Sequence, residues 1–261
     1  MSIISQVIFT VILGIFVFFI IRRVNFIRLN IALGRPQKVV GNKRQRWKNV
    51  LLIALGQKKM FKKPVPAVLH LLIYVGFILI NIEVLEIILD GFLGSHRIFA
   101  PLLSDFYGPL ISFFEILAIG VIFSCILFLL RRNVMHVARF KKPEMKGWAS
   151  LDGNLILVIE IILMVAILSM NAADQLLQEM GNPAYTLTGS FLVSSWLMPI
   201  FDGYAPSTLF IIERMSWWFH ILGIFGFALY VTYSKHLHIF LAFFNTYFSK
   251  LTPRGAMEPM P

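Results

Sequence analysis

Residues 3–23 read IISQVIFTVILGIFVFFIIRR, a predominantly apolar run that ends at two arginines. A helix needs roughly 20 such residues to cross the hydrocarbon core of a membrane. Four more runs of this kind follow, and the predicted spans lie near Ile3–Ile21, Pro66–Leu89, Leu110–Leu130, Leu155–Met170 and Ser216–Tyr233. The first run has no basic residues before it and no small-residue cleavage site, so we expect a retained anchor rather than a signal peptide. The sequence therefore predicts an all-α membrane protein, a five-helix transmembrane bundle forming a single membrane domain over 1–261.

The composition supports this class. Of the 261 residues, 58% are hydrophobic and 14% are charged, whereas roughly a quarter of a soluble domain is charged. The single cysteine, Cys125, excludes a disulfide framework and an iron–sulfur cluster ligated by this chain alone. The net charge of +11 could suggest nucleic acid, but the basic residues alternate with the predicted spans. We therefore expect membrane lipid, and no nucleic acid, as a partner.

The distribution of Lys and Arg predicts the orientation of the helices. Residues 22–63 carry 13 of them, residues 131–146 carry six, and the tail from Lys235 carries three. The intervening segments 91–107 and 171–214 carry one each. Because basic loops remain in the cytoplasm, the N-terminus is expected outside and the C-terminus in the cytoplasm.

Two segments between the spans have their own expected structure. Residues 22–63 form a basic cytoplasmic segment, and the mixture of apolar and basic side chains over 43–63 favours a helix lying at the membrane interface. Its positive charge would attract either an acidic docking partner or anionic lipid alone. Residues 171–214 form an external loop, whose short apolar stretch 185–201 is bracketed by prolines and predicts an interfacial or re-entrant segment.

Three histidines stand out by their position in the predicted spans. His70 is about one turn into the second span at its cytoplasmic end, and His238 closes the fifth span on the same side. His220 precedes His238 by 18 residues, so both rings would share one helix face roughly 27 Å apart. Two imidazoles at one depth on facing helices are what a low-spin haem needs as axial ligands. Gly223, one turn beyond His220, would leave room for a flat macrocycle.

The other histidines are placed differently. His236 would point to nearly the opposite side of the helix from His238. His136 lies in a basic loop and is expected to be an ordinary interfacial residue. For His96, in the outer loop, the same interpretation is favoured over ligation.

The stretches 219–223 (FHILG) and 233–239 (YSKHLHI) resemble the last helix of the γ subunit of respiratory nitrate reductase, a five-span dihaem cytochrome b. Together with residues 55–60 (LGQKKM), Pro66 and His70, they resemble still more the membrane domain of heterodisulfide-reductase-like oxidoreductases. Some of those proteins are thought to pass electrons from electron-transfer flavoprotein to menaquinone. The resemblance covers essentially the whole chain, and the Tyr-Ser-Lys-His-x-His stretch is its specific part.

The resemblance implies haem b and assigns its ligands. His70 and His238 would ligate the iron nearer the cytoplasm, and His220 would ligate an iron nearer the outside. The nitrate reductase family has a second His ten residues after the first, where this chain has Ile80. His96 is then the only external candidate opposite His220, so one haem is expected and a second is open.

The resemblance also implies a cellular context. His236 and Gly223 are expected from their positions as further cofactor-binding residues, and the resemblance implies menaquinone or another quinone as the substrate. The partner would be a cytoplasmic iron–sulfur, heterodisulfide-reductase-like domain or electron-transfer flavoprotein. The expected location is the cytoplasmic (inner) membrane of a bacterium or archaeon. Related proteins continue into cysteine-rich domains, so we expect that part as a separate subunit or beyond Pro261.

Four acidic residues lie inside the predicted spans, where a carboxyl group is costly and is expected to be protonated, paired or directed into the bundle. Glu83 and Glu86 are one turn apart on one helix face, and we expect them to supply quinone or proton chemistry. For Glu115 and Glu160, helix–helix hydrogen bonding and function are equally good interpretations.

These features favour a membrane-anchored b-type cytochrome subunit that transfers electrons between a cytoplasmic partner and quinone. The alternative is a proton- or cation-coupled transporter or channel that uses the buried glutamates, although no inverted, broken helices are visible. A membrane diiron oxygenase needs histidine clusters, and the only close pair here is His236 and His238. A purely structural anchor would remain if the chain binds no haem.

Overall fold

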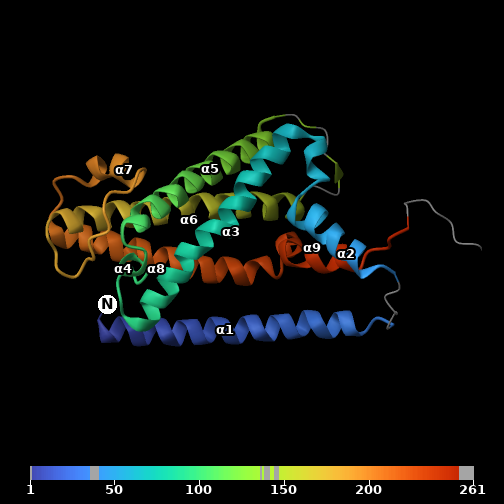
Figure 1. Ribbon diagram of the computed structural model, residues 1–261, viewed down its shortest axis with the longest axis horizontal. Coiled ribbons are helices and arrows are strands. Elements are labelled where there is room, and N and C mark those ends of the chain that lie inside the picture. Colours follow the sequence, from blue (N-terminus) through green and yellow to red (C-terminus); the bar gives the residue numbers. More distant parts are fainter. Residues whose placement is uncertain (1, 36–40, 136, 138–141, 144–146, 253–261) are drawn as a thin grey trace, which may run out of the picture. The chain divides into compact units, whose positions relative to one another are not determined.

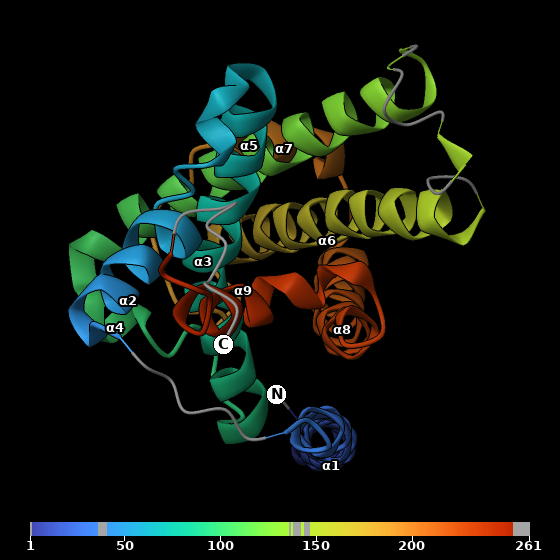
Figure 2. The same ribbon diagram turned by 90° about the vertical axis from the view of Figure 1, so that its right-hand side faces the viewer.

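The structure is a computed structural model that describes residues 2–35, 41–135, 137, 142–143 and 147–252 (Figures 1 and 2). Over these residues it contains helices and no strand, which confirms the predicted all-α class. The long helices are α1 (Ile3–Ala32), α3 (Pro64–Leu93), α5 (Tyr107–Asn133), α6 (Trp148–Glu179) and α8 (Pro206–Val231). Shorter α-helices are α2 (Lys43–Asn49), α4 (Ala100–Leu103), α7 (Ser194–Phe201) and α9 (His238–Tyr247).

Most of the long helices can cross a membrane. Four helical segments, Ile3–Ala32, Pro64–Leu93, Ala100–Asn133 and Trp148–Glu179, are long and apolar enough. The number becomes five if the interrupted pair Pro206–Val231 and Lys235–Tyr247 forms one span. The chain is therefore a helical protein whose helices are consistent with several membrane crossings. The side of the membrane on which each terminus lies stays a prediction.

The chain divides into two compact units, and α1 and α3 contribute to both. Unit 1 comprises Met1–Ile20 and Leu69–Tyr230, and unit 2 comprises Ile21–Val68 and Val231–Pro261. In unit 1, α5 and α6 run side by side, and α7 packs on α6 (Figure 1). The core of unit 1 is formed by buried aromatic and aliphatic side chains from several helices, including Phe9, Tyr107, Phe191 and Ile221.

Several helices extend beyond the predicted spans because polar residues continue them. The fourth predicted span was placed near Leu155–Met170, whereas α6 runs from Trp148 to Glu179. Asn171, Asp174 and Gln178 in its last turns are buried, so they belong to the bundle interior rather than to an external loop. The residues 171–214 are thus partly helix α6 and partly helix α8, which begins at Pro206.

The apolar stretch within this region forms the short helix α7. It has eight residues, far fewer than the roughly 20 needed to cross the hydrocarbon core. Its first residues are held by Glu115 of α5, which accepts hydrogen bonds from the backbone N–H groups of Val193 (2.8 Å) and Ser194 (3.1 Å). Helix α7 is thus too short to span a membrane, and an interfacial or re-entrant position for residues 185–201 stays a prediction.

The fifth predicted span, Ser216–Tyr233, is helical as far as Val231, but the helix does not continue to His238 as we expected. Helix α8 ends at Val231, a single 3₁₀ turn covers Lys235–Leu237, and α9 begins at His238. Ser234 causes this restart, because its extended backbone and its hydroxyl, which accepts from the His236 N–H at 2.9 Å, form an N-cap. The expected five-turn relation between His220 and His238 on one helix is therefore wrong.

Unit 2 contains the basic segment in helical pieces. After α2 come a π-helical turn, Val50–Leu55, and a 3₁₀ turn, Met60–Lys62, so residues 43–63 are helical in part, as predicted. Arg46 is buried and donates to the carbonyl oxygens of Tyr247 (2.7 Å) and Ser249 (2.9 Å), where it caps the end of α9. The position of residues 43–63 at the membrane interface stays a prediction.

Candidate functional site

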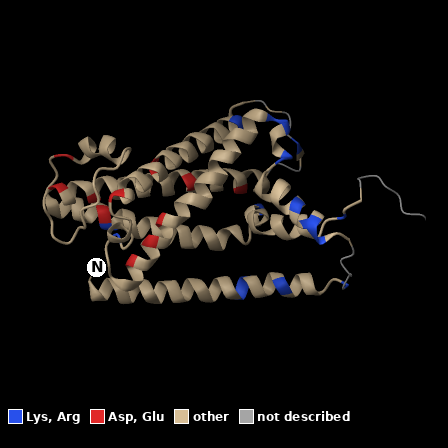
Figure 3. Ribbon diagram, in the orientation of Figure 1, with Lys and Arg blue, Asp and Glu red and all other residues tan. Residues whose placement is uncertain are grey.

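Two polar stripes face the interior of unit 1 near the ends of α3 and α6. Glu83, Glu86 and Asp90 occupy positions i, i+3 and i+7 of α3, and all three are buried. Asn171, Asp174 and Gln178 repeat this spacing on α6 and are also buried. Acidic residues gather at this end of α3, at the end of α6 and at the start of α8 (Figure 3). We call Glu83, Glu86, Asp90, Asn171, Asp174 and Gln178, together with Arg97, the carboxylate cluster.

Arg97 joins the two stripes. Its Nε donates to Asp174 Oδ2 at 2.9 Å, its Nη2 donates to Asn171 at 2.6 Å, and its Nη1 lies 3.4 Å from Glu83 Oε1. The residue follows the end of α3 with a φ of 53°, a left-handed conformation that is unusual for any residue but glycine. That backbone is held by Asp90, which accepts the Arg97 N–H at 2.8 Å.

Arg97 keeps its charge in this buried position. Desolvation opposes ionisation, but the surrounding groups, Tyr107, Asp174 and Glu83 foremost, raise the pKa of its guanidinium well above the usual value. A buried cation is stable when charged and hydrogen-bonded partners surround it. Arg97 is thus the cation that organises the cluster.

The remaining acids of α3 bind the loop and helices that follow. Glu86 accepts hydrogen bonds from the Tyr107 hydroxyl at 2.7 Å and from the Phe99 N–H at 2.8 Å. Asp90 also accepts from the Ser95 hydroxyl at 2.6 Å and the Ile98 N–H at 3.1 Å. The hydrogen bonds of both carboxylates therefore hold the segment between α3 and α5 against the end of α3.

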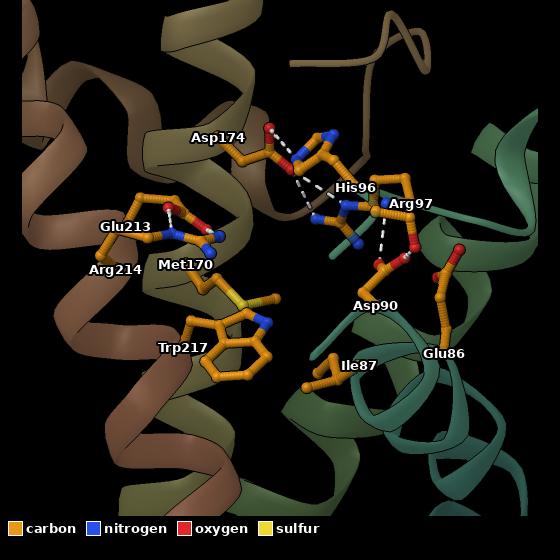
Figure 4. A pocket seen from close by; sticks show the side chains of 11 residues that line it. Glu86, Ile87, Asp90, His96, Arg97, Met170, Asp174, Glu213, Arg214 and Trp217 are labelled. Carbon is orange, nitrogen blue, oxygen red and sulfur yellow. Dashed lines mark hydrogen bonds and ion pairs between the residues drawn. The ribbon is translucent and has the colours of Figure 1, made fainter. Parts of the chain in front are cut away.

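A pocket opens beside this cluster (Figure 4). One wall is charged, with carboxylates and guanidinium groups from three helices and a loop, while the floor is apolar. The lining consists of Glu86, Ile87, Asp90, Ser95, His96, Arg97, Met170, Asp174, Glu213, Arg214 and Trp217. The pocket therefore presents charged and hydrogen-bonding groups on one side and apolar groups on the other.

The start of α8 contributes an ion pair to the pocket. Arg214 binds the carboxylate of its neighbour Glu213, which is buried and also accepts from the Tyr185 hydroxyl at 3.0 Å. Burial and Glu213 raise the pKa of the Tyr185 hydroxyl above its usual value, so it stays protonated and donates. Trp217, one turn further along α8, forms part of the apolar floor.

His96 has both ring nitrogens engaged. Its Nδ1 accepts the Thr186 N–H at 3.0 Å, and its Nε2 lies 3.3 Å from Asp174 Oδ1. Its ring also packs edge-on against Tyr185. In this arrangement no nitrogen of His96 is left for iron, so we do not propose it as the ligand opposite His220.

His220 has the opposite property. It is completely buried, its Nδ1 lies 2.9 Å from the carbonyl oxygen of Leu163, and its Nε2 has no hydrogen-bond partner among the described residues. A carbonyl can only accept, so Nδ1 carries the proton and the lone pair of Nε2 faces the bundle interior. Metal-binding histidines commonly have this second-shell bond.

Gly223 lies next to this contact. A Cβ atom there would come within 2.6 Å of the Leu163 Cδ2 atom, so the space beside Gly223 is filled by Leu163. We expected this space to admit a macrocycle, whereas in the structure it lets α6 approach α8 at the level of His220.

The other expected ligands fall in separate units. His70 is half-buried on α3 in unit 1, whereas His236 and His238 belong to unit 2. The Nδ1 of His238 lies 3.1 Å from the Lys235 carbonyl oxygen, so this exposed ring also directs Nε2 away from its own backbone. Whether His70 and His238 face each other stays a prediction, and His136 lies outside the described residues.

The sequence interpretation identified Glu83 and Glu86 but missed their partners. The sequence held a signal for these partners, because polar residues recur at helical spacing within apolar surroundings. Asp90 continues the spacing of Glu83 and Glu86, and Asn171 and Asp174 are one turn apart. Arg97 was counted only as an exception to the charge distribution. Its place among three helices depends on the fold of the loop, which no local pattern specifies.

Comparison with known proteins relates the chain to an oxidoreductase. It is 24% identical, over 247 residues, to the probable iron-sulfur-binding oxidoreductase FadF of Bacillus subtilis (strain 168). The match covers 94% of this chain but 32% of that protein, so the chain spans about a third of its relative's length. No protein-family model matches the chain, and no solved structure matches it. The chain is thus a distant relative of an iron–sulfur-binding oxidoreductase along nearly its whole length.

Proposed function

We propose that this chain is the membrane electron-transfer part of a quinone-linked oxidoreductase and that it binds haem b. The observation that carries this proposal is His220, a fully buried imidazole whose Nδ1 is fixed by the Leu163 carbonyl and whose Nε2 has no partner among the described residues. An unsatisfied polar atom in a bundle core is costly, and coordination of iron would satisfy it.

The residue that best suits a haem iron is His220, because its buried Nε2 has no partner among the described residues. His220 of α8 would hold one iron, His70 and His238 are the residues proposed to hold another, and His236 is a further proposed cofactor-binding residue. Bound haem would supply a one-electron carrier in the interior of the bundle. The protein would contribute ligand orientation through backbone carbonyls, as the Nδ1 contacts of His220 and His238 suggest.

The pocket beside the carboxylate cluster is the proposed quinone site. Its floor of Ile87, Met170 and Trp217 would contact the apolar ring, and its charged wall would bind the ring oxygens. Trp217 is three residues from His220, so the floor lies one helical turn from the proposed iron ligand. Glu86 lines this pocket, whereas Glu83 lies behind it against Arg97 and Asn171. Glu86 is therefore the better candidate to exchange a proton with the ring.

The relative supports the choice of partner. FadF is described as a probable iron–sulfur-binding oxidoreductase, and about two thirds of it lie outside the match. We propose that a cytoplasmic iron–sulfur domain or a flavoprotein exchanges electrons with this chain, and that the N-terminus lies outside a bacterial or archaeal cytoplasmic membrane. The exchange would run between this partner and menaquinone or another membrane quinone.

The fixed hydrogen bonds of the acids weigh against a transporter. Glu83, Glu86 and Glu115 each accept from protein donors, and an ion passing along them would have to displace these bonds. The cluster is therefore better explained as a binding wall than as a conduction path.

The test uses the purified chain in detergent. Under argon, the protein is reduced first with dithionite and, in a second sample, with a short-chain menaquinol. The proposal expects a b-type absorption band in both samples. Absence of the band with dithionite would contradict haem binding, and a band with dithionite alone would contradict the quinone assignment.

A further inference from the structure

Arg23 is the second basic residue after the apolar run of α1, and it turns into unit 2. Its Nη2 donates to the carbonyl oxygen of Thr232 at 3.1 Å, just after α8 ends. Its Cζ lies 3.9 Å from the centre of the Tyr233 ring, and a second ring, Phe26, lies 5.0 Å away. These contacts hold the guanidinium at the interruption between α8 and α9.

The guanidinium has an unused donor in this place. Its Nε–H is buried and has no hydrogen-bond partner among the described residues. No Asp or Glu occurs among the described residues of unit 2, so no carboxylate of the unit offsets its charge there. The carbonyl and the aromatic faces stabilise the cation only in part, and this half-buried residue still has a shielded donor without a partner.

Arg22 makes the contrast clear. It is the neighbouring residue on the same helix, it carries the same charge, and it is exposed. Water or lipid headgroups can solvate Arg22, whereas the Nε–H of Arg23 is shielded from solvent. Of these two neighbouring arginines, Arg23 is therefore the one that needs an anion.

We propose that Arg23 binds an anionic oxygen ligand at the interruption between α8 and α9. Guanidinium groups bind carboxylate and phosphate with short, charge-assisted hydrogen bonds. Two ligands can supply this chemistry: a propionate carboxylate of haem, and the phosphate of a phospholipid headgroup. Haem is one candidate because Thr232 and Tyr233, which Arg23 contacts, directly precede the segment that carries His236 and His238. This source rests on the proposed function. The phospholipid source does not depend on it.

The experiment compares the wild-type chain with Arg23→Gln, Arg23→Lys and Arg22→Gln, each purified in the same detergent. Two quantities are measured: the midpoint potential of the haem by redox titration, and the phospholipid phosphorus that copurifies with each mole of protein. A positive charge beside a haem favours its reduced state. Arg23→Gln should therefore lower the potential if the ligand is a propionate. Arg23→Lys should restore part of it, and Arg22→Gln should not change it.

If the ligand is a phospholipid, Arg23→Gln instead loses bound phosphorus while the potential stays at the wild-type value. The proposal is overturned if Arg23→Gln and Arg22→Gln match the wild type in both measurements. A wild-type protein without haem would contradict the proposed function, and the phosphorus measurement would still decide for or against the anion site. If Arg23→Gln fails to fold, Arg23→Lys decides, because it keeps the charge but lacks the Nε donor: it should fall below the wild type in potential or in bound phosphorus, and a match to the wild type in both would overturn the proposal.

Discussion

The Nδ1 atom of His220 lies 2.9 Å from the carbonyl oxygen of Leu163, and both residues are buried where α8 meets α6. This one contact fixes the proton on Nδ1 and leaves Nε2 as the free acceptor of the ring. It depends on a close approach of the two helices, and the approach depends on the missing side chain at Gly223.

The first prediction concerns this approach. Gly223→Ala should destabilise the protein by about 1–3 kcal/mol, because its Cβ would come within 2.6 Å of Leu163 Cδ2 in a filled core. Gly226→Ala is the matched control, since a Cβ there meets nothing within 4 Å. The measurement is the thermal unfolding temperature in detergent. In a double-mutant cycle, Gly223→Ala should cost less stability in a Leu163→Ala background than in the wild type, because the clash is gone. Equal unfolding temperatures for the two glycine variants would contradict the close approach.

The second prediction concerns Arg97. Arg97→Gln should cost about 3–5 kcal/mol, because it leaves Glu83 and Asp174 buried without their cation. Arg22→Gln, an exposed arginine, should change stability little. Thermal unfolding of the two variants measures the difference. Near-identical unfolding temperatures would mean that Arg97 does not organise the cluster.

The third prediction separates the two acids that the sequence left ambiguous. Glu115 accepts from Val193, Ser194 and Asn171, whereas Glu160 has no hydrogen bond to any described residue. A Gln side chain has one oxygen to accept with, so Glu115→Gln should cost roughly 1.5–3 kcal/mol. Glu160→Gln should be neutral or stabilising. The reverse order of stability would remove Glu115 from its structural role.

Hydropathy was enough to locate the long helices of this protein, because a long apolar run in a membrane protein is almost always a helix. It did not find where the helices end. Helix α6 continues through Asn171 and Asp174, whose polarity resembles that of a loop until their partners are known. The break after Val231 depends on Ser234 as a cap, a signal that the apolar and basic residues around it obscured.

The candidate site was predictable only in part. The two glutamates of α3 and the histidine at position 220 could be picked out because polar groups within apolar spans are costly. The hydrogen bonds that orient these side chains involve residues distant in sequence, such as Leu163 for His220 and Tyr107 for Glu86. These depend on how helices pack, which a single sequence does not encode locally.

The fourth prediction tests the quinone pocket. Glu86→Gln should slow menaquinol-dependent haem reduction, because Glu86 lines the pocket and the amide cannot take up a proton. Glu83→Gln should have the smaller effect on this rate, since Glu83 lies behind Arg97. The dithionite-reduced spectrum should stay unchanged in both, and it serves as the folding control. Wild-type rates in both variants would return these residues to a structural role.

The most direct measurement of the central claim is the dithionite-reduced minus oxidised spectrum of the purified protein and its histidine variants. We expect a b-type band in the wild type, loss of the same component in His70→Ala and His238→Ala, and no change in His136→Ala. His220→Ala should remove a second component and leave the first. A wild-type protein without a b-type band, or a full band in all three ligand variants, would contradict the account.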